Sequence, residues 1–164
     1  MFPLCFSLLR AAARGKKYSV RFLLACGADI EQKDEDGRTP LMLAARNGHP
    51  EVVSMLLAGG AQIEQKDEEG GTALTLAAYF GHCSVVELLM SRGADIEQKD
   101  NAGRTPLMLA SQSGHPEVVS MLLAGGAQIE QKDEDGDTPI LLAARHGHPE
   151  VLSILANKGA MLDA

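Results

Sequence analysis

The sequence predicts an all-α solenoid of about five stacked helix-turn-helix repeats, which are joined by short β-hairpin loops. Two observations predict this fold. The pentapeptide "IEQKD" begins at Ile30, Ile63, Ile96 and Ile129, so it recurs every 33 residues. A longer pattern recurs around it: G-x-T-[PA]-[LI], then A-[AS], then G-H, then a run of Val, Leu and Met that ends near Gly. A fixed period of about 20–50 residues indicates repeats that are each one supersecondary unit.

Each unit begins with a short helix, as residues 39–48 illustrate. Thr39 is suited to be the N-cap, and Pro40 stands at the first helical position, where its missing N–H costs nothing. The segment "PLMLAARN" then places its Leu and Ala residues on one side for about two turns. Gly48 supplies a left-handed residue that ends the helix.

A second helix follows in each unit. Pro50 opens "PEVVSMLLA", in which the Val and Leu residues fall at helical spacing, and Gly59 and Gly60 end it. The segment "AQIEQKDEDGR" then carries Asp and Gly, which suit a tight hairpin tip. Helices this short are marginal alone, so each unit must bury its apolar sides against the units before and after it.

The recurring residues resemble the ankyrin-repeat family. They are Gly37, Thr39, Pro40, Leu41, Ala44, Ala45, Gly48, His49 and the Leu56-Leu57 pair that leads to Gly60-Ala61. The resemblance covers nearly the whole chain and implies one ankyrin-repeat domain over residues 1–164. Residues 1–33 are then a degenerate capping repeat, residues 34–66, 67–99 and 100–132 are full repeats, and residues 133–164 are the C-terminal repeat. The family is a scaffold without a catalytic centre, so the resemblance implies that the chain is no enzyme and needs no cofactor.

The chain departs from the family pattern at two places in each repeat. The histidine that usually follows T-P-L, and that bonds adjacent units, is replaced by Met42, Thr75, Met108 and Leu141. The asparagine usual in the hairpin is replaced by Glu31, Glu64, Glu97 and Glu130. We therefore expect packing to supply some of the lost stability. We also expect the Ile of "IEQKD" to reach into the stack and its charged side chains to face solvent.

Both ends of the chain leave two interpretations open. Residues 1–28 hold five basic residues and no acidic one, which is typical of a mitochondrial presequence. Shifted by one period, however, they align their Ala-Ala, Gly and Leu-Leu with those of the next unit, which favours a folded cap. At the other end, Ala156, Asn157 and Lys158 replace less polar residues, as in a natural cap or in a piece of a longer array.

Composition limits the partners and the compartment. The other ten basic residues and all 22 acidic ones follow residue 28, and so acidic a body argues against nucleic-acid binding. No apolar run approaches the roughly 18–20 residues that a membrane span needs. Cys5, Cys26 and Cys83 form no close pair, so they signal neither a disulfide framework nor a zinc site. We expect an intracellular monomer, cytoplasmic or nuclear.

The histidines of the G-H pairs are expected to be structural. They are His49, His82, His115 and His148, one per repeat. Helix packing separates such a row by about 8–10 Å, too far for ligands that must each lie about 2 Å from one ion. In the family this histidine fixes the turn between the helices. The "DEDG" tips also fail as calcium loops, because Gln32 and Leu43 fall at ligand positions. No metal site is expected.

The resemblance implies a binding surface on the concave face, which hairpin tips and first helices line. The candidates are the positions on this face that differ between repeats. After A-[AS] they are Arg46, Asn47, Tyr79, Phe80, Gln112, Ser113, Arg145 and His146. At the tips they are Glu35, Asp36, Arg38, Glu68, Glu69, Arg104, Glu134, Asp135 and Asp137, with Gly71, Asn101 and Ala102 at matching places.

Tyr79 and Phe80 are the sharpest candidates, because the other repeats carry polar residues at these places. Exposed aromatics near the middle of a surface are common hot spots, each worth more than about 1 kcal/mol in an interface. Tyr79 is expected to be the more exposed, and Phe80 either shares in binding or packs on a neighbouring repeat. Arg46 and Arg145 pair with a partner's carboxylates or, by default, with nearby tip acids.

These features predict a non-catalytic protein–protein interaction scaffold. Its partner is expected to be a protein or peptide that presents basic residues to the acidic tips and an apolar group to the two rings. One alternative is an assembly spacer, in which the basic first repeat of one copy meets the acidic body of another. A further alternative is the recognition domain of a larger enzyme or effector. The segment His49–Glu68 recurs letter for letter at His115–Glu134, which indicates recent copying of a two-repeat unit.

Overall fold

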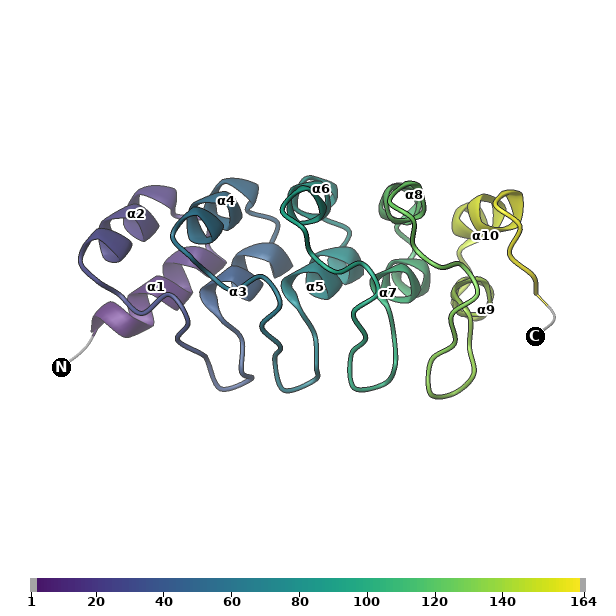
Figure 1. Cartoon of the computed structure of the whole chain (residues 1–164), viewed down its shortest axis with the longest axis horizontal. Helices are drawn as coiled ribbons and strands as arrows, with labels where there is room; N and C mark the ends of the chain where they lie inside the picture. The colour runs from purple at the N-terminus through teal and green to yellow at the C-terminus, as the bar shows by residue number, and fades with distance from the viewer. Residues whose placement is uncertain (1–2, 163–164) are drawn as a thin grey trace.

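The computed structural model describes residues 3–162 and contains ten helices in that part of the chain. They are α1 (Pro3–Ala13), α2 (Lys17–Ala25), α3 (Pro40–Arg46), α4 (Pro50–Ala58), α5 (Ala73–Phe80), α6 (Cys83–Ser91), α7 (Pro106–Ser113), α8 (Pro116–Ala124), α9 (Pro139–Arg145) and α10 (Pro149–Asn157). The helices stand in pairs, side by side and in chain order, from one end of an elongated stack to the other (Figure 1). The predicted all-helical solenoid is confirmed. Residues 1–2 and 163–164, at the outer ends of the predicted first and last repeats, lie outside the described part.

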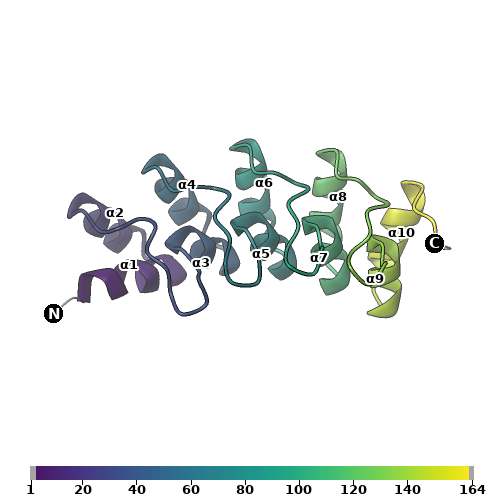
Figure 2. The same cartoon turned by 60° about the horizontal axis from the view of Figure 1, so that its bottom comes forward.

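The helices form two rows. The first helices of the pairs (α1, α3, α5, α7 and α9) make one row, the second helices make the other, and long loops run beneath the first row (Figures 1 and 2). The helix boundaries follow the predicted signals. The Thr39 hydroxyl accepts a hydrogen bond from the Met42 N–H at 3.3 Å, and Pro40 is the first residue of α3. Gly48, with φ +76°, adopts the left-handed conformation predicted for the end of the first helix.

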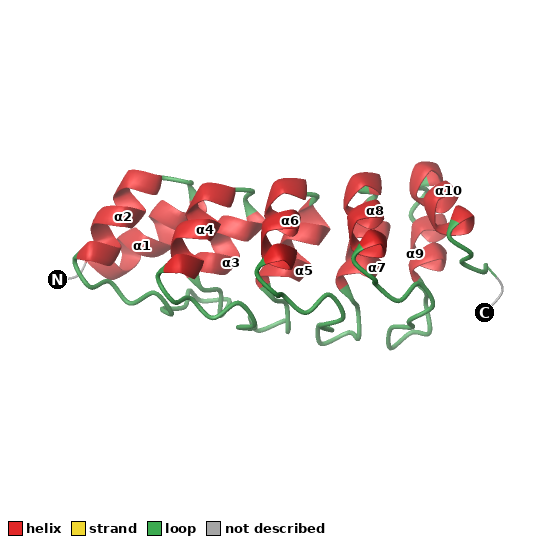
Figure 3. Ribbon diagram, turned by 45° about the horizontal axis from the view of Figure 1, so that its top comes forward, coloured by secondary structure: helices red, strands yellow, loops and turns green. Residues whose placement is uncertain are grey.

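The loops fold back on themselves as hairpins, but no residue between 3 and 162 belongs to a β-strand (Figure 3). Aspartate turns replace the expected strand pairing. Asp34 Oδ1 accepts hydrogen bonds from the N–H of Asp36 at 3.0 Å and of Arg38 at 2.8 Å. The same pair of bonds forms at Asp67, Asp100 and Asp133. Each tip is therefore held by one carboxylate oxygen, which fixes the direction of the residues beside it.

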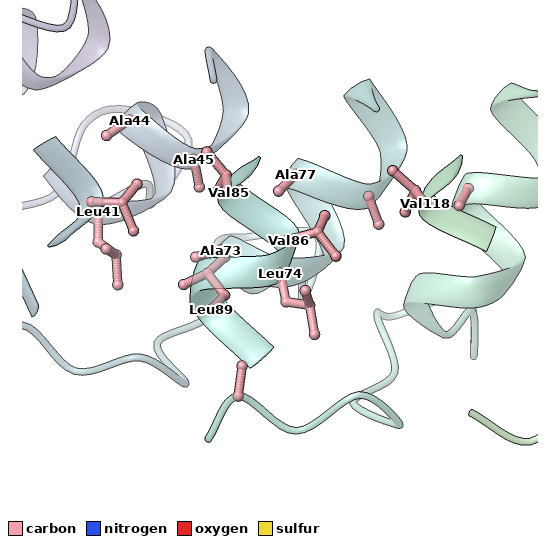
Figure 4. Close-up of a cluster of buried hydrophobic side chains, with 14 of the residues drawn as sticks. Leu41, Ala44, Ala45, Ala73, Leu74, Ala77, Val85, Val86, Leu89 and Val118 are labelled. Atoms are coloured by element: carbon pink, nitrogen blue, oxygen red, sulfur yellow. The ribbon is translucent and has the colours of Figure 1, made fainter. Parts of the chain in front are cut away.

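The core runs through the whole stack. Small alanines on the first helices let consecutive helices approach, and Val and Leu from the second helices cover them, as Figure 4 shows for Ala77, Val86 and Leu89. One hydrophobic cluster extends from Leu8 to Leu155. Met42 and Met108 stand after T-P-L, where the family usually has histidine. They are 1% and 0% exposed, so they pack in the core as expected. Thr75 instead receives a hydrogen bond from the Thr72 N–H at 2.7 Å.

The histidines of the G-H pairs have a structural role, as predicted, but they bond the preceding repeat. His82 Nε2 lies 2.8 Å from the Arg46 carbonyl oxygen, and His115 Nε2 lies 2.8 Å from that of Tyr79. His49 and His148 make the equivalent contacts at 3.0 and 2.9 Å. Since a carbonyl oxygen only accepts, Nε2 carries the proton. Each histidine thus joins its second helix to the end of the previous first helix.

The glutamates of "IEQKD" form a second link between repeats. The expectation that they face solvent holds for Glu130, which is exposed, and is wrong for Glu31, Glu64 and Glu97, which are half-buried. Glu97 Oε1 accepts a hydrogen bond from the Gln128 N–H, 31 residues further on, at 2.7 Å. Glu31, Glu64 and Glu130 bond the next repeat in the same way, at 2.8–2.9 Å. A glutamate is long enough to reach the neighbouring loop, so each junction has this hydrogen bond in addition to the one from the histidine.

Candidate functional site

The predicted site residues belong to the loop tips and to the C-terminal ends of α3, α5, α7 and α9, which together are here called the first-helix face. Figure 1 shows the loops along one side of the row of first helices. At its middle is a hollow of about 250 Å³, here called the central pocket. Its lining comes from three consecutive repeats: Arg38, Arg46, Asp67, Glu69, Gly71, Thr75, Leu76, Tyr79, Phe80, Asp100, Arg104, Leu109 and Gln112.

Tyr79 and Phe80 form one wall of the central pocket. Their rings meet edge to face, with centroids 5.0 Å apart and planes at 79°. The two residues are equally exposed, at 39% and 38%, so exposure does not distinguish Tyr79 from Phe80. Phe80 does contact a neighbouring repeat, because the Arg46 guanidinium lies 4.8 Å from its ring centroid. Both rings still present apolar surface to solvent.

The two arginines at the helix ends differ in their partners. Arg145 forms two hydrogen bonds to the Asp137 carboxylate, one of them at 2.9 Å, and Asp137 is only 6% exposed. Pairing with a tip acid is therefore confirmed for Arg145. For Arg46 it is wrong: within residues 3–162 it forms no ion pair, and it lies over Phe80 instead. Arg38 stands where the last repeat has Asp137, so the matching acid is missing, and the Arg46 guanidinium lies over the phenyl ring of the next repeat.

The tip charges divide into paired and unpaired groups. Arg38 pairs with Asp36 at 2.9 Å, and Arg104 binds Asp100 through Nε at 2.9 Å and a second nitrogen at 2.8 Å. Five exposed acids form no ion pair with any described residue: Glu35, Glu68, Glu69, Glu134 and Asp135. The tips therefore present a net negative charge to solvent, because their two arginines, Arg38 and Arg104, are each paired with a carboxylate.

Only part of the predicted set meets in the central pocket. The residues brought together are Arg38, Arg46, Glu69, Tyr79, Phe80, Arg104 and Gln112. Those outside it are Asn47, Ser113, Arg145, His146, Glu35, Asp36, Glu68, Glu134, Asp135 and Asp137. Besides Asp36, Arg145 and Asp137, whose pairs are described above, two of these form side-chain bonds. The Asn47 amide donates to the Ala13 carbonyl at 2.8 Å, and His146 Nδ1 lies 2.9 Å from the Leu142 carbonyl.

Sequence reasoning missed the floor of the central pocket. Asp67 and Asp100 are the same residue in every repeat, so a search for variable positions passed over them. Leu76 and Leu109 looked like ordinary helix residues. Gly71 could have indicated this part of the site. The matching positions of the other three tips carry charged side chains, Arg38, Arg104 and Asp137, and Gly71 does not.

A second exposed aromatic pair lies far from this face in the sequence. Tyr18 and Phe22, one turn apart on α2, are 74% and 65% exposed. They stand within the basic segment, near Lys17, which pairs with Glu51 at 2.8 Å. The pair had no repeat equivalent to draw attention to it, because Glu51 and Met55 occupy the matching places.

Residues 3–162 contain no cluster of three or more His, Cys, Asp or Glu side chains arranged to hold a metal ion. The same residues include no helix long and apolar enough to cross a membrane. The two cysteines whose side chains are described, Cys26 and Cys83, are free thiols, and the side chain of Cys5 lies outside the description.

A comparison with known protein families matches residues 8–100 and 92–164 to the family described as ankyrin repeats (3 copies). The chain therefore belongs to the ankyrin-repeat family, whose members are generally protein–protein interaction modules and typically non-catalytic. A comparison with curated protein sequences gives no match.

Proposed function

We propose that this protein is a non-catalytic scaffold that binds a protein or peptide partner through its first-helix face, with Tyr79 and Phe80 at the centre of the contact. The observation that carries the proposal is the exposure of these two rings at the wall of a pocket shared by three repeats. A paired, half-buried aromatic wall offers apolar area without needing to be ordered on binding.

The unpaired acids of the tips define the other half of the contact. Glu68 and Glu69 stand at the tip that leads into α5, and Glu35, Glu134 and Asp135 extend the negative charge along the stack. Complementary charge speeds encounter and orients a partner more than it adds affinity. We infer a partner with basic residues and an apolar anchor, and not a nucleic acid. As part of the same proposal, the protein acts as an intracellular monomer, which suits its free thiols.

The double variant Tyr79→Ala/Phe80→Ala tests this proposal. A partner captured with the wild-type protein is expected to bind the variant more than about tenfold more weakly, because each ring contributes more than about 1 kcal/mol. The melting temperature should change little, since neither ring is part of the buried core.

The chain offers a matched control in Tyr18→Ala/Phe22→Ala, which removes the same two residue types from α2. This variant is expected to keep wild-type affinity. Equal binding by the wild type and the Tyr79/Phe80 variant would refute the site, and equal loss in both double variants would point to a non-specific aromatic contact.

The exposed Tyr18 and Phe22 favour a second candidate function, head-to-tail self-association. Arg21 and Tyr18 line a hollow together with Met55, so a basic and apolar surface is available to the acidic tips of another copy. Light scattering should then rise with protein concentration. The rise should disappear at high salt and in Tyr18→Ala/Phe22→Ala; scattering of a monomer at every concentration would exclude this role.

A further inference from the structure

We propose that the central pocket binds the guanidinium group of an arginine side chain of the partner. This inference rests on the proposed function, because it names the group that enters the first-helix face. It begins with a comparison among the four tips. At the position of Gly71 the other tips carry Arg38, Arg104 and Asp137, so this tip lacks a side chain where its neighbours have a charged one.

The tip that precedes α7 shows how a guanidinium can fill this place, whereas at the tip that precedes α3 Arg38 pairs with Asp36 instead. Asp100 Oδ1 accepts hydrogen bonds from the backbone N–H of Ala102 and Arg104, both at 2.9 Å. Its other oxygen, Oδ2, receives the Arg104 guanidinium at 2.8 and 2.9 Å. The carboxylate thus uses one oxygen for the turn and the other for a guanidinium, and it is only 6% exposed.

At the tip that precedes α5 the first half of this arrangement is present and the second is missing. Asp67 Oδ1 accepts hydrogen bonds from the N–H of Glu69 at 3.0 Å and of Gly71 at 2.8 Å. Oδ2 receives no hydrogen bond from the described residues. A Cβ atom on Gly71 would lie 3.3 Å from both carboxylate oxygens and 3.2 Å from Thr75 Oγ1, so the Gly71 position is directly beside the charge.

An aromatic ring closes the other side of this space. Arg145 stands at the position of Tyr79 two repeats later, and its side chain reaches Asp137, which stands at the position of Gly71. Side chains at these two positions therefore meet across the first-helix face. With glycine at one position and tyrosine at the other, the pocket has a carboxylate floor and a ring wall.

A guanidinium suits both surfaces. It bonds a carboxylate through a planar fork, and it stacks on aromatic rings, whereas an ammonium offers neither the fork nor the stacking. The neighbouring Phe80 already receives a guanidinium in this way, from Arg46 at 4.8 Å.

The side chains that line the pocket carry three carboxylates and three guanidinium groups, but two of the guanidinium groups are already paired. Arg38 is bound to Asp36, and Arg104 to Asp100. The groups without an ion pair among the described residues are the carboxylates of Asp67 and Glu69 and the guanidinium of Arg46. Two carboxylates therefore face one cation, which favours the entry of a second cation.

Selection of a random peptide library on the immobilised protein tests the inference. Peptides whose binding depends on Tyr79 and Phe80 are expected to share an arginine. Replacing that arginine by citrulline, a neutral side chain of the same shape, should weaken binding to the wild type more than about tenfold. The same replacement should have little further effect on Asp67→Asn, because the paired charge is already gone.

Gly71→Arg is the most specific variant, because it supplies the arginine that two of the other tips already carry. It is expected to lose these peptides, while Gly71→Ala, which introduces the same Cβ contacts, retains them and serves as the control for any change in melting temperature. As a second measurement, NMR titration with Nα-acetyl-arginine methylamide should shift the amide signals of Glu69 and Gly71 in the wild type, and not in Gly71→Arg.

The outcomes separate the two proposals. Selected peptides that all ignore Tyr79 and Phe80 would refute the proposed binding face, and the NMR titration would then decide the pocket alone. Peptides that depend on the rings but contain no arginine, or that tolerate citrulline or prefer lysine, would overturn the guanidinium pocket and leave the face intact. Unchanged peptide binding by Gly71→Arg, or no shift of the two amide signals, would also overturn it.

Discussion

Residues 34–66 and 67–99 share one framework and differ on the first-helix face. Thr39 and Thr72 cap the first helices in the same way, and Gly48 and Gly81 end them with φ values of +76° and +77°. On the face, however, the first segment presents Arg38 and Arg46 while the second presents Gly71, Tyr79 and Phe80. The framework positions hold the stack, so the face positions are free to carry the specificity.

The copied segment strengthens this comparison. Residues 49–68 and 115–134 are identical, and their second helices begin with nearly the same backbone angles, φ −112° and ψ 80° at His49 and φ −112° and ψ 85° at His115. The segment between them, which includes α5, carries the aromatic pair and the glycine. Copying therefore reproduced the framework on both sides of the proposed site.

Core truncation should have the largest effect, and the effect should be equal in both kinds of repeat. Leu56, Leu89 and Leu122 occupy one repeat position and are each 0% exposed. Changing any one to Ala is expected to lower the free energy of unfolding by about 2–5 kcal/mol, because it leaves a cavity. Urea unfolding followed by circular dichroism measures it. A loss below about 1 kcal/mol for Leu89 alone would show that the framework is not shared.

Glycine substitutions should separate backbone strain from the histidine link. Gly81 and Gly93 both have positive φ, +77° and +86°, which costs alanine about 1–2 kcal/mol. A Cβ on Gly81 would also lie 2.5 Å from His115 Nδ1, whereas one on Gly93 would meet nothing within 4 Å. Gly81→Ala is therefore expected to lose about 1 kcal/mol more than Gly93→Ala, through the displaced hydrogen bond. Equal losses in urea unfolding would mean that the histidine link adds no stability.

Removal of one glutamate link should have a smaller effect. Glu97→Ala removes the acceptor of the exposed Gln128 N–H, which water can then reach, and is expected to lower the free energy of unfolding by about 0.5–1.5 kcal/mol. Glu87→Ala, an exposed residue of the same type on α6, serves as the control and should change it by less than about 0.5 kcal/mol. If Glu97→Ala and Glu87→Ala change the free energy of unfolding equally, as measured by thermal and urea unfolding, the glutamate link does not stabilise the stack.

The smallest effect concerns reactivity and leaves stability unchanged. Cys83 stands where the copied segments have proline, and burial, together with a hydrogen bond from Sγ to Glu117 Oε2 at 3.3 Å, raises the pKa of its thiol. A raised pKa means less thiolate at a given pH, so Cys83 should react more slowly with iodoacetamide than exposed Cys26. Glu117→Gln should speed Cys83 alone, as peptide mass spectrometry would show; an unchanged rate would contradict the stated cause.

The sequence was sufficient for the fold because its signals are local. A threonine cap, a proline at the first helical position and a glycine at the end need no knowledge of distant residues, and the period places each unit against the next. The glutamate links were not predictable in this way, because the acceptor and donor lie 31 residues apart and nothing near Glu97 marks its partner. For the same reason, a charged pentapeptide looked like a solvent-facing loop.

Part of the candidate site was predictable and part was not. Tyr79 and Phe80 stood out because they differ from their counterparts, and the structure places both at the central pocket. Asp67 did not stand out, since the same residue recurs at every tip, and only the absence of a side chain at Gly71 distinguishes its surroundings. This site consists of a carboxylate that every tip carries and a neighbouring position that lacks a side chain in one tip. A comparison of variable residues does not identify the carboxylate.

The two links between repeats have a consequence for how such a gene can lengthen. The histidine bonds join residues 36 apart and the glutamate bonds join residues 31 apart, at every junction of the stack. A duplicated block of whole repeats therefore regenerates both bonds at its new junctions, whichever residue the block starts from. Unequal recombination can add repeats without a structural defect, whereas insertion or loss of a single residue between bonded partners changes their spacing at once.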